Sequence, residues 1–313
     1  MNHILSSEQF TNDELLDIFE RADTFRLRDE GGLEYRRELA SMYVGARVCS
    51  LFYEPSTRTR LSFETAAVAM GMGLVSTENA GEFSSAAKGE TLEDTIRVLD
   101  ELAFNAIILR HPADGSAAEA ASVSSTPIIN GGDGKGEHPT QALLDVYTIQ
   151  NNLERLGNLR IVMGGDLKHG RTVRSLAKML AKYPNNKITF VSLPELQIGQ
   201  DIKDLLEEHR VEYTETGEMY DALRDADVVY WTRTQKERHS QSGDTGAPNP
   251  KEEFIIDSTA LEVLPQKAII MHPLPRVGEI PTDVDSDPRA IYFRQAGNGL
   301  YVRMALLDMI MSE

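Results

Sequence analysis

The chain has 313 residues, enough for two domains at about 150 residues each, and its 41% apolar and 26% charged residues are typical of a globular protein. Its 49 acidic and 32 basic residues give a formal net charge of −17. A surface this negative repels nucleic acid and anionic membranes, and no run rich in lysine or arginine counters it, so we expect neither as a partner. The single cysteine, Cys49, excludes an intramolecular disulfide and favours a reducing compartment. Without a run of roughly 18 apolar residues or a recognisable secretory signal, the sequence predicts a soluble cytoplasmic protein.

Periodic apolar residues in the first half of the chain predict alternating helices and strands. The first helix begins with a capping box, in which Thr11 precedes Glu14 by three positions. Residues 79–89, rich in glycine, serine and alanine, are typical of a mobile loop. The other predicted elements are strands at 47–53, 106–109 and 127–130 and helices at 15–25, 61–70 and 92–99.

The second half continues this alternation, which requires crossover connections and therefore parallel sheets with both faces covered. The predicted fold class is α/β, with two domains that each contain a parallel β-sheet flanked by helices. The Gly/Asp-rich run 131–137 sets the expected boundary between domain 1–137 and domain 138–296, and we assign the C-terminal helix, about 297–313, to the first domain. Predicted strands lie at 159–165, 188–193, 211–215, 227–231 and 268–272, and predicted helices at 138–153, 173–180 and 300–311.

Ligands of such folds bind beyond the carboxyl ends of the strands, so residues that directly follow strands are the candidates for chemistry. The run EPSTRTR at 54–60 joins a predicted strand to a predicted helix. Hydroxyls, a guanidinium and backbone N–H groups at the positive end of a helix suit a phosphate. Serine and threonine at this position also serve as ordinary helix caps, but the doubled Thr-Arg favours the phosphate site.

Further polar residues follow other predicted strands. Arg110 directly follows one strand, although a lone arginine there can equally be a solvated surface residue. His138 and Gln141 lie at the start of a predicted helix and could hydrogen-bond a carbonyl oxygen and an amide. Pro139 between them is a common first residue of a helix, so His138 could equally have a capping or packing role.

The run GGDLKHGR at 164–171 follows a glycine-ended strand, yet its spacing is not the G-x-G-x-x-G of a dinucleotide site. Lys168 and Arg171 suit a carboxylate better. The runs TRTQKER at 232–238 and HPLPR at 272–276 also follow strands, and the prolines of the latter predict a rigid turn whose carbonyls could accept hydrogen bonds from an amine. The set Arg58, Arg110, Arg171 and Arg233 indicates a multiply charged anionic ligand.

Metal and hydrolase chemistry are disfavoured. His138, His169 and His272 lack metal-ligand spacing, and one cysteine cannot build a thiolate site. No G-x-S-x-G nucleophile elbow occurs in the sequence. We therefore expect no metal and no other cofactor.

Together these motifs resemble the signatures of the aspartate/ornithine carbamoyltransferase family. The similarity runs from about Leu51 to the QAGNG segment at 295–299 and includes STRTR before LSFET, HPTQ before LLD, GDLKHGRTV, TRTQKER and HPLPR. HPLPR, in place of HCLP, and the lack of an SMG motif indicate the aspartate-specific branch. The resemblance implies transfer of a carbamoyl group from carbamoyl phosphate to the amino group of L-aspartate, giving N-carbamoyl-L-aspartate and phosphate in de novo pyrimidine biosynthesis. Another amine acceptor and a non-catalytic anion-binding homologue are the alternatives.

The same resemblance implies a role for each matching residue. Arg58, Thr59, Arg110 and His138 would be catalytic. Carbamoyl phosphate would be bound by these four together with Ser56, Thr57, Gln141, Pro273, Leu274, Ser84 and Lys88. Aspartate would be bound by Arg171, Arg233, Gln235, Leu274 and Lys88.

In the family, a serine and a lysine of a flexible loop enter the neighbouring subunit's site, and Ser84 and Lys88 match them. The resemblance therefore implies a homotrimer with shared active sites. Residues 239–250 depart from the family pattern, which leaves the details of domain closure open. Whether a regulatory chain associates also stays open.

Overall fold

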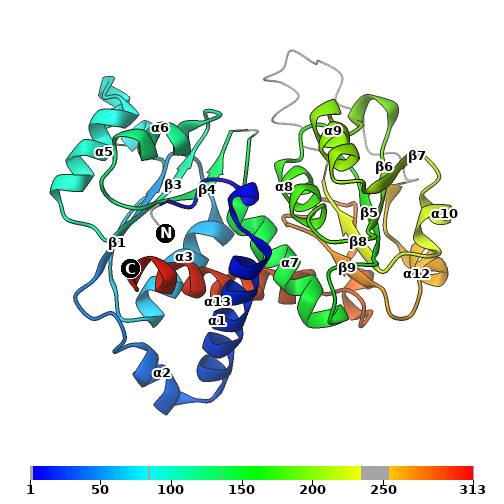
Figure 1. The fold of residues 1–313 in the computed structure, drawn as a ribbon, viewed down its shortest axis with the longest axis horizontal. Helices are drawn as coiled ribbons and strands as arrows, with labels where there is room; N and C mark the ends of the chain where they lie inside the picture. The colour runs from blue at the N-terminus through cyan, green and yellow to red at the C-terminus, as the bar shows by residue number, and fades with distance from the viewer. Residues whose placement is uncertain (1–2, 84, 135, 234–253, 313) are drawn as a thin grey trace. The chain divides into compact units, whose positions relative to one another are not determined.

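A computed structural model of the chain describes residues 3–83, 85–134, 136–233 and 254–312. It divides into two compact units, which we call unit 1 (residues 1–144 and 297–313) and unit 2 (residues 145–296). The divisions fall inside two helices, α7 (Pro139–Leu153) and α13 (Tyr292–Met311) (Figure 1). In the residues that the structure describes, no helix is long and apolar enough to cross a membrane.

Unit 1 is built on four parallel strands in the order β2-β1-β3-β4. The strands are β1 (Arg47–Phe52), β2 (Gly73–Thr77), β3 (Ala106–His111) and β4 (Ile128–Asp133). The helices wholly within this unit are α1 (Asn12–Glu30), α2 (Leu33–Leu39), α3 (Thr57–Ala69), α4 (Ala80–Phe83), α5 (Leu92–Glu101) and α6 (Ser116–Val123), with 3₁₀ turns η1 (Ser7–Gln9) and η2 (Ser85–Lys88).

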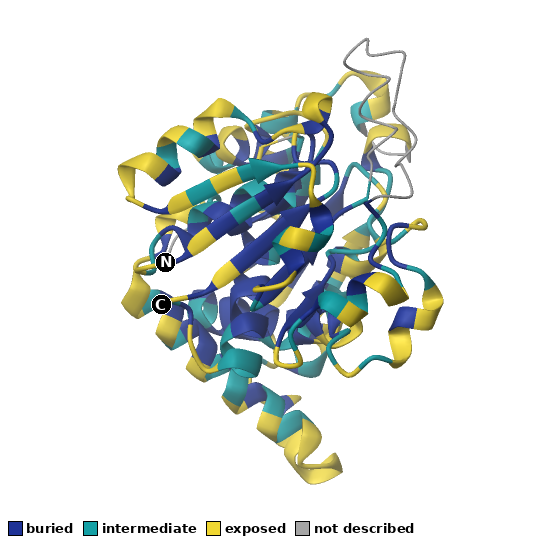
Figure 2. Cartoon of the chain, turned by 90° about the vertical axis from the view of Figure 1, so that its right-hand side faces the viewer, coloured by how far each residue is buried: buried dark blue, intermediate teal, exposed yellow. Residues whose placement is uncertain are grey.

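The apolar runs of the central strands are explained by cover on both faces of this sheet. Cys49 and Leu51 of β1 pack with apolar residues of α4, α5 and α6. Their neighbours along the strand point to the opposite face, where α3 contacts β1 and β2. Figure 2 shows that buried residues run in bands along strands of the chain.

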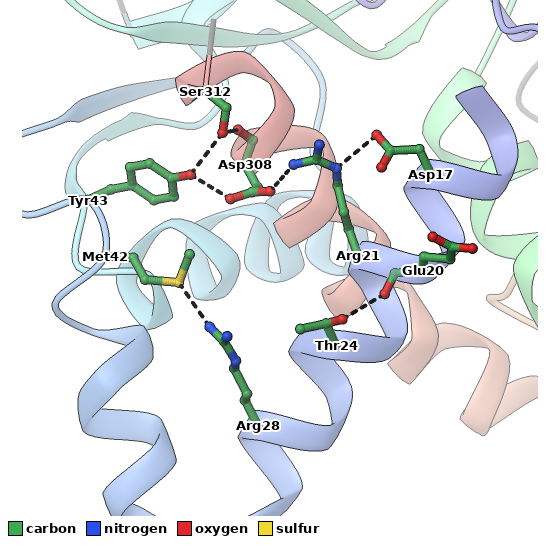
Figure 3. Close-up of polar contacts among 9 residues, drawn as sticks. All are labelled: Asp17, Glu20, Arg21, Thr24, Arg28, Met42, Tyr43, Asp308 and Ser312. Atoms are coloured by element: carbon green, nitrogen blue, oxygen red, sulfur yellow. Dashed lines mark hydrogen bonds and ion pairs between the residues drawn. The ribbon is translucent and has the colours of Figure 1, made fainter. Parts of the chain in front are cut away.

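The C-terminal helix α13 ends against α1, as we had assigned it. The Asp308 carboxylate accepts hydrogen bonds from Arg21 of α1 and from the hydroxyl of Tyr43, each at 2.5 Å (Figure 3). Ser312 donates to the Asp308 carbonyl at 2.7 Å, and the Tyr301 hydroxyl donates to Asp29 at 3.2 Å. These contacts bring the last turns of the chain into the first folded unit.

The prediction of a loop over residues 79–89 is wrong. This stretch contains the short helix α4 and the 3₁₀ turn η2, with Ser84 outside the described residues. Glu82 N donates to the Asn79 carbonyl at 2.9 Å, and Ala80 is fully buried in the cluster formed with α5 and α6. Alanine favours helix, and burial of Ala80 adds a tertiary contact that the glycine and serine content did not reveal.

Unit 2 contains five parallel strands in the order β7-β6-β5-β8-β9. One face packs against α10 and α12, and α8 and α9 lie on the other (Figure 1). The predicted α/β class, with two helix-flanked parallel sheets, is therefore confirmed. The elements are β5 (Arg160–Gly164), α8 (Arg171–Leu180), β6 (Lys187–Val191), η3 (Pro194–Leu196), α9 (Gln200–Glu208), β7 (Glu212–Thr216), α10 (Met219–Leu223), β8 (Val228–Trp231), α12 (Ser258–Val263), β9 (Ile269–Met271) and η5 (Thr282–Ser286).

Candidate active site

The N-terminus of α3 presents the EPSTRTR segment after strand β1. Ser56 occupies the N-cap position in an extended conformation, and its side chain makes no capping hydrogen bond. The capping explanation for this serine therefore does not hold. Thr57 and Arg58 are exposed in the first turn, whereas Thr59 is buried. The arrangement places hydroxyls and a guanidinium at the positive end of the helix dipole, where an anion is stabilised.

Thr59 and His138 meet in unit 1 although 79 positions separate them in the sequence. Thr59 Oγ1 lies 3.2 Å from His138 Nε2, and both residues are buried. The Thr140 hydroxyl lies 3.5 Å from His138 Nδ1. A threonine and a histidine held in this way can both donate to one ligand oxygen when that oxygen replaces their mutual contact.

The loop that leads into His138 is held by two carboxylates that sequence analysis missed. Asp133, at the end of β4, accepts from Glu137 N at 3.0 Å and from Gly115 N at 3.1 Å. Glu137 in turn accepts from the backbone N and the hydroxyl of Ser7, both at 2.8 Å. The sequence did carry a signal for these carboxylates, because both lie in a glycine-rich run between a strand and a helix. The backbone N–H groups of such a run need side-chain acceptors.

Arg110 lies at the end of β3 and is half-buried. Its Nη1 donates to the Gly131 carbonyl at 3.2 Å, and its Nε lies 3.5 Å from Glu54 Oε2. A side chain at Gly131 would sit 3.2 Å from the Leu109 carbonyl oxygen, so glycine permits this approach of β3 and β4. Glu54, to which we assigned no role, places a negative charge beside Arg110.

Two further predicted residues of unit 1 lie on neighbouring elements. Gln141 lies in the first turn of α7, half-buried, and its backbone N donates to the His138 carbonyl at 3.0 Å. Lys88 ends η2 and is exposed. Ser84 lies outside the described residues.

In unit 2, Arg171 is the first residue of α8 and is buried. The turn before it is held by Asp166, whose Oδ1 lies 3.0 Å from His169 Nδ1 and 3.1 Å from His169 N. His169 thus has a structural partner in this turn. Arg171 thus brings a guanidinium to the start of this helix, and a guanidinium is the group that we predicted would bind a carboxylate in this segment.

The glycine pair that ends β5 is explained by packing. A Cβ on Gly164 would lie within 2.5 Å of three ring atoms of the buried Trp231, and a Cβ on Gly165, at φ +104°, would lie 2.9 Å from the Thr232 hydroxyl. Thr232 N also donates to the Gly164 carbonyl at 2.9 Å. The close approach of β5 and β8 therefore requires these glycines. Packing alone explains them, and a dinucleotide-binding role is not needed to do so. Arg233 follows Thr232 and is half-buried, whereas Gln235 and residues 239–250 lie outside the described residues.

The HPLPR turn after β9 is tied to its own histidine. Leu274 N donates to His272 Nδ1 at 2.8 Å, and His272 Nε2 lies 2.7 Å from Glu279 Oε1. Burial acts to raise the pKa of Glu279, but the interactions with His272 and with backbone N–H groups together outweigh it and hold this pKa below its usual value. Arg276 is ion-paired with Asp285. Sequence analysis attributed the rigidity of this turn to its prolines and did not identify the His272–Glu279 pair.

Both halves of the chain match family models. Residues 2–151 match the carbamoyl phosphate-binding domain of aspartate/ornithine carbamoyltransferases, and residues 157–310 match the aspartate/ornithine-binding domain. The chain belongs to the aspartate/ornithine carbamoyltransferase family.

Relatives of this carbamoyltransferase cover nearly its whole length. It is 48% identical to the chloroplastic aspartate carbamoyltransferase of Oryza sativa, over 99% of this chain and 85% of the relative. It is 43% identical to the aspartate carbamoyltransferase catalytic subunit of Clostridium acetobutylicum, over 98% of this chain and 97% of that one.

Solved structures of the family share its fold. Aspartate transcarbamoylase from Trypanosoma cruzi in complex with N-(phosphonacetyl)-L-aspartic acid is 38% identical, with a TM-score of 0.89 over 98% of this chain and 94% of that chain. The catalytic subunit of M. jannaschii aspartate transcarbamoylase is 41% identical, with a TM-score of 0.86 over 100% of this chain and 98% of that chain. The family indicated by the sequence motifs is confirmed.

Proposed function

We propose that this carbamoyltransferase transfers the carbamoyl group from carbamoyl phosphate to the amino group of L-aspartate, giving N-carbamoyl-L-aspartate and phosphate. The observation that carries the proposal is the similarity to proteins named aspartate carbamoyltransferase, such as the Oryza sativa protein at 48% identity over 99% of the chain. The T. cruzi aspartate transcarbamoylase has been solved in complex with carbamoyl phosphate and in complex with aspartate and phosphate. The reaction is the carbamoylation step of pyrimidine biosynthesis.

In the proposed mechanism, unit 1 binds carbamoyl phosphate. Ser56, Thr57, Arg58 and the N-terminus of α3 neutralise the phosphate, which makes it a better leaving group. As the amine attacks the carbonyl carbon, negative charge develops on the carbonyl oxygen, and donors from Thr59, Arg110 and His138 stabilise it. The 3.2 Å contact between Thr59 and His138 supports this role, because it holds both side chains at one point, where the carbonyl oxygen can take the place of their mutual hydrogen bond.

The bond changes balance without a protein base. The aspartate nitrogen forms a bond to the carbamoyl carbon, and the bond from that carbon to the phosphate oxygen then breaks. The departing phosphate can accept the proton that the amine loses. Holding the two substrates together supplies much of the remaining rate acceleration.

Unit 2 would bind aspartate. Arg171 and Arg233 are suited to its two carboxylates because guanidinium groups bind carboxylates in a bidentate manner, with Gln235, Leu274 and Lys88 as further ligands. The carbonyls of Pro273 and Leu274, with Gln141, would orient the carbamoyl amide. We accordingly assign carbamoyl phosphate to the domain 1–137 plus 297–313 and aspartate to the domain 138–296.

The proposed assembly is a homotrimer in which Ser84 and Lys88 serve a neighbouring subunit's site. The exposed position of Lys88 supports this role. The mass of the native protein tests it directly, and co-purification of a second chain would reveal a regulatory partner. We also propose a cytoplasmic location, which fractionation of the source cells would test, since the plant relatives are named as chloroplastic.

The activity is tested by measuring phosphate release from carbamoyl phosphate with aspartate or ornithine as acceptor. We expect aspartate to be used, with N-carbamoyl-L-aspartate identified by mass. Arg58→Ala should lower turnover by about a hundredfold or more, as for loss of a transition-state donor. Arg97→Ala, which removes an exposed arginine paired with Glu93 and Asp94, is the matched control and should keep wild-type turnover. The proposal would be contradicted if phosphate were released with ornithine but not with aspartate, or if neither acceptor increased phosphate release.

A further inference from the structure

The imidazole of His272 is buried at 1% exposure, and both of its ring nitrogens contact protein groups. Nδ1 lies 2.8 Å from the Leu274 backbone nitrogen, and Nε2 lies 2.7 Å from Glu279 Oε1. A backbone N–H can only donate, so Nδ1 must be the acceptor and carries no proton. The ring hydrogen of the neutral imidazole therefore sits on Nε2 and points to the Glu279 carboxylate.

Glu279 closes this arrangement from the other end of the turn. Its Oε2 accepts from Val277 N at 2.9 Å, while its Oε1 faces the His272 ring. One imidazole and one carboxylate therefore bind the backbone N–H groups of both Leu274 and Val277. The bonds to the Glu279 carboxylate are charge-assisted and so stronger than neutral ones, and the turn is held at both Leu274 and Val277.

The backbone of His272 is in turn fixed to the core of unit 2. Gln295 Oε1 accepts from His272 N at 2.9 Å, and Gln295 Nε2 donates to Asp145 Oδ1 at 2.6 Å. Asp145 also accepts from the Tyr230 hydroxyl at 2.8 Å. Gln295, Asp145 and Tyr230 are all buried. Tyr230 makes a further hydrogen bond to Thr172, the residue after Arg171. The network thus joins the HPLPR turn to the helix start that carries a predicted aspartate ligand.

The Leu274 N–H and the Pro273 carbonyl belong to one planar peptide unit. Fixing the direction of this N–H toward His272 therefore fixes the direction of the Pro273 carbonyl, which points away from the ring. Leu274 also has a φ of +53°, a conformation that a leucine adopts only where its surroundings enforce it. The hydrogen bond from Leu274 N to His272 supplies such a constraint on one side of the Leu274 carbonyl, and the bond from Val277 N to Glu279 holds the turn on its other side.

We propose that His272 is a positioning residue, which directs the Pro273 and Leu274 carbonyls at the amide of carbamoyl phosphate and so makes the enzyme select a carbamoyl over an acetyl group. This inference rests on the proposed function. Acetyl phosphate has a methyl group where carbamoyl phosphate has its NH₂. The methyl group cannot donate to the two carbonyls and would leave them without the hydrogen bonds that the amide makes.

Two substitutions separate the contacts of the ring. In His272→Asn, the side-chain oxygen can replace Nδ1 as acceptor for the N–H two residues ahead, as in an Asx turn, but it is too short to reach Glu279. In His272→Gln, the longer side chain reaches toward Glu279 and no longer places an acceptor at the Nδ1 position. Both variants lose the ring, but His272→Asn keeps only the contact to Leu274 and His272→Gln keeps only the contact to Glu279. A difference between them therefore shows which contact matters.

The readout is the ratio of kcat/KM for carbamoyl phosphate to that for acetyl phosphate, with aspartate as acceptor. We expect His272→Gln to lower this ratio by about tenfold or more, the effect of losing hydrogen bonds to a polar substrate group. His272→Asn should keep the ratio within about threefold of wild type. Inhibition by inorganic phosphate, which has no amide, should be unchanged in both variants. Equal loss of selectivity in the two variants, or wild-type selectivity in His272→Gln, would overturn the proposal.

A second measurement observes the ring nitrogens of the wild-type protein directly and does not depend on the activity of any variant. With ¹⁵N-labelled histidine, the wild-type spectrum should show a His272 ring with an unprotonated Nδ1 and a protonated Nε2, assigned by comparison with His272→Asn. A proton on Nδ1 would overturn the proposed geometry. If the wild-type protein released no phosphate with aspartate, the proposed function would fail, and the nitrogen spectrum would still decide the role of His272 in the turn.

Discussion

Replacing Gly164 with alanine places a methyl group against the only tryptophan of the chain. The added Cβ would lie within 2.5 Å of three ring atoms of Trp231, whereas ordinary carbon contacts are about 3.5–4 Å. Trp231 is fully buried, and its Nε1 donates to the Phe254 carbonyl at 2.9 Å. The ring would therefore have to move by about an ångström in a closely packed core.

The expected cost follows from these contacts. Overpacking of a core costs about 1–3 kcal/mol, and loss of the Trp231 hydrogen bond adds about 1 kcal/mol. We therefore expect Gly164→Ala to lower the free energy of unfolding of unit 2 by about 2–4 kcal/mol. With a urea dependence of about 2 kcal/mol per M, the unfolding midpoint should fall by about 1–2 M.

Tryptophan fluorescence during urea unfolding measures this effect, because all of the signal comes from Trp231. Gly217→Ala is the matched control, since a Cβ there meets no atom within 4 Å. The control should change stability by less than about 0.5 kcal/mol. A wild-type midpoint for Gly164→Ala, or equal shifts for the two variants, would refute the packing explanation of this glycine.

Three other predictions concern catalysis, pH and thiol reactivity. Thr59→Val, which is nearly isosteric but has no hydroxyl, should lower kcat by about a hundredfold; unchanged kcat in a steady-state assay would remove Thr59 from the oxyanion site. Burial alone would raise the pKa of Asp100, but hydrogen bonds from residues 124–126 outweigh it and lower this pKa. The stabilisation is thus present above the unfolded-state value of about 4 and is lost as the pH falls through the lowered pKa. Asp100→Asn should cost about 1 kcal/mol at pH 7, and in thermal unfolding the difference between wild type and variant should shrink as the pH falls below about 4; a constant difference would contradict this. Burial raises the pKa of the Cys49 thiol to about 12. Iodoacetamide at pH 8 should therefore label it, as followed by mass, far more slowly in the native protein than in urea, and equal rates would show that the thiol is exposed.

Local patterns predicted most elements of both sheets. The capping box is present, because Thr11 and Glu14 exchange hydrogen bonds with each other's backbone N–H groups at 3.2 and 2.7 Å. Strand β1 and helix α7 also occupy the predicted regions. These features depend on residues a few positions apart, so their signal lies within a short stretch of sequence. Helix α4 was missed because the burial of Ala80 depends on residues of α5 and α6.

By itself, the sequence determined the α/β class, the family and the identity of the residues proposed for the chemistry, since periodicity and motif order are properties of the linear chain. Only the tertiary structure decided which of those residues touch. The contact between Thr59 and His138 depends on how the elements pack around the sheet. The close approach of Gly164 to Trp231 depends on the pairing of β5 with β8, and the bond from Leu274 to His272 depends on a turn conformation. Such distances arise from three-dimensional packing, and no spacing along the chain encodes them.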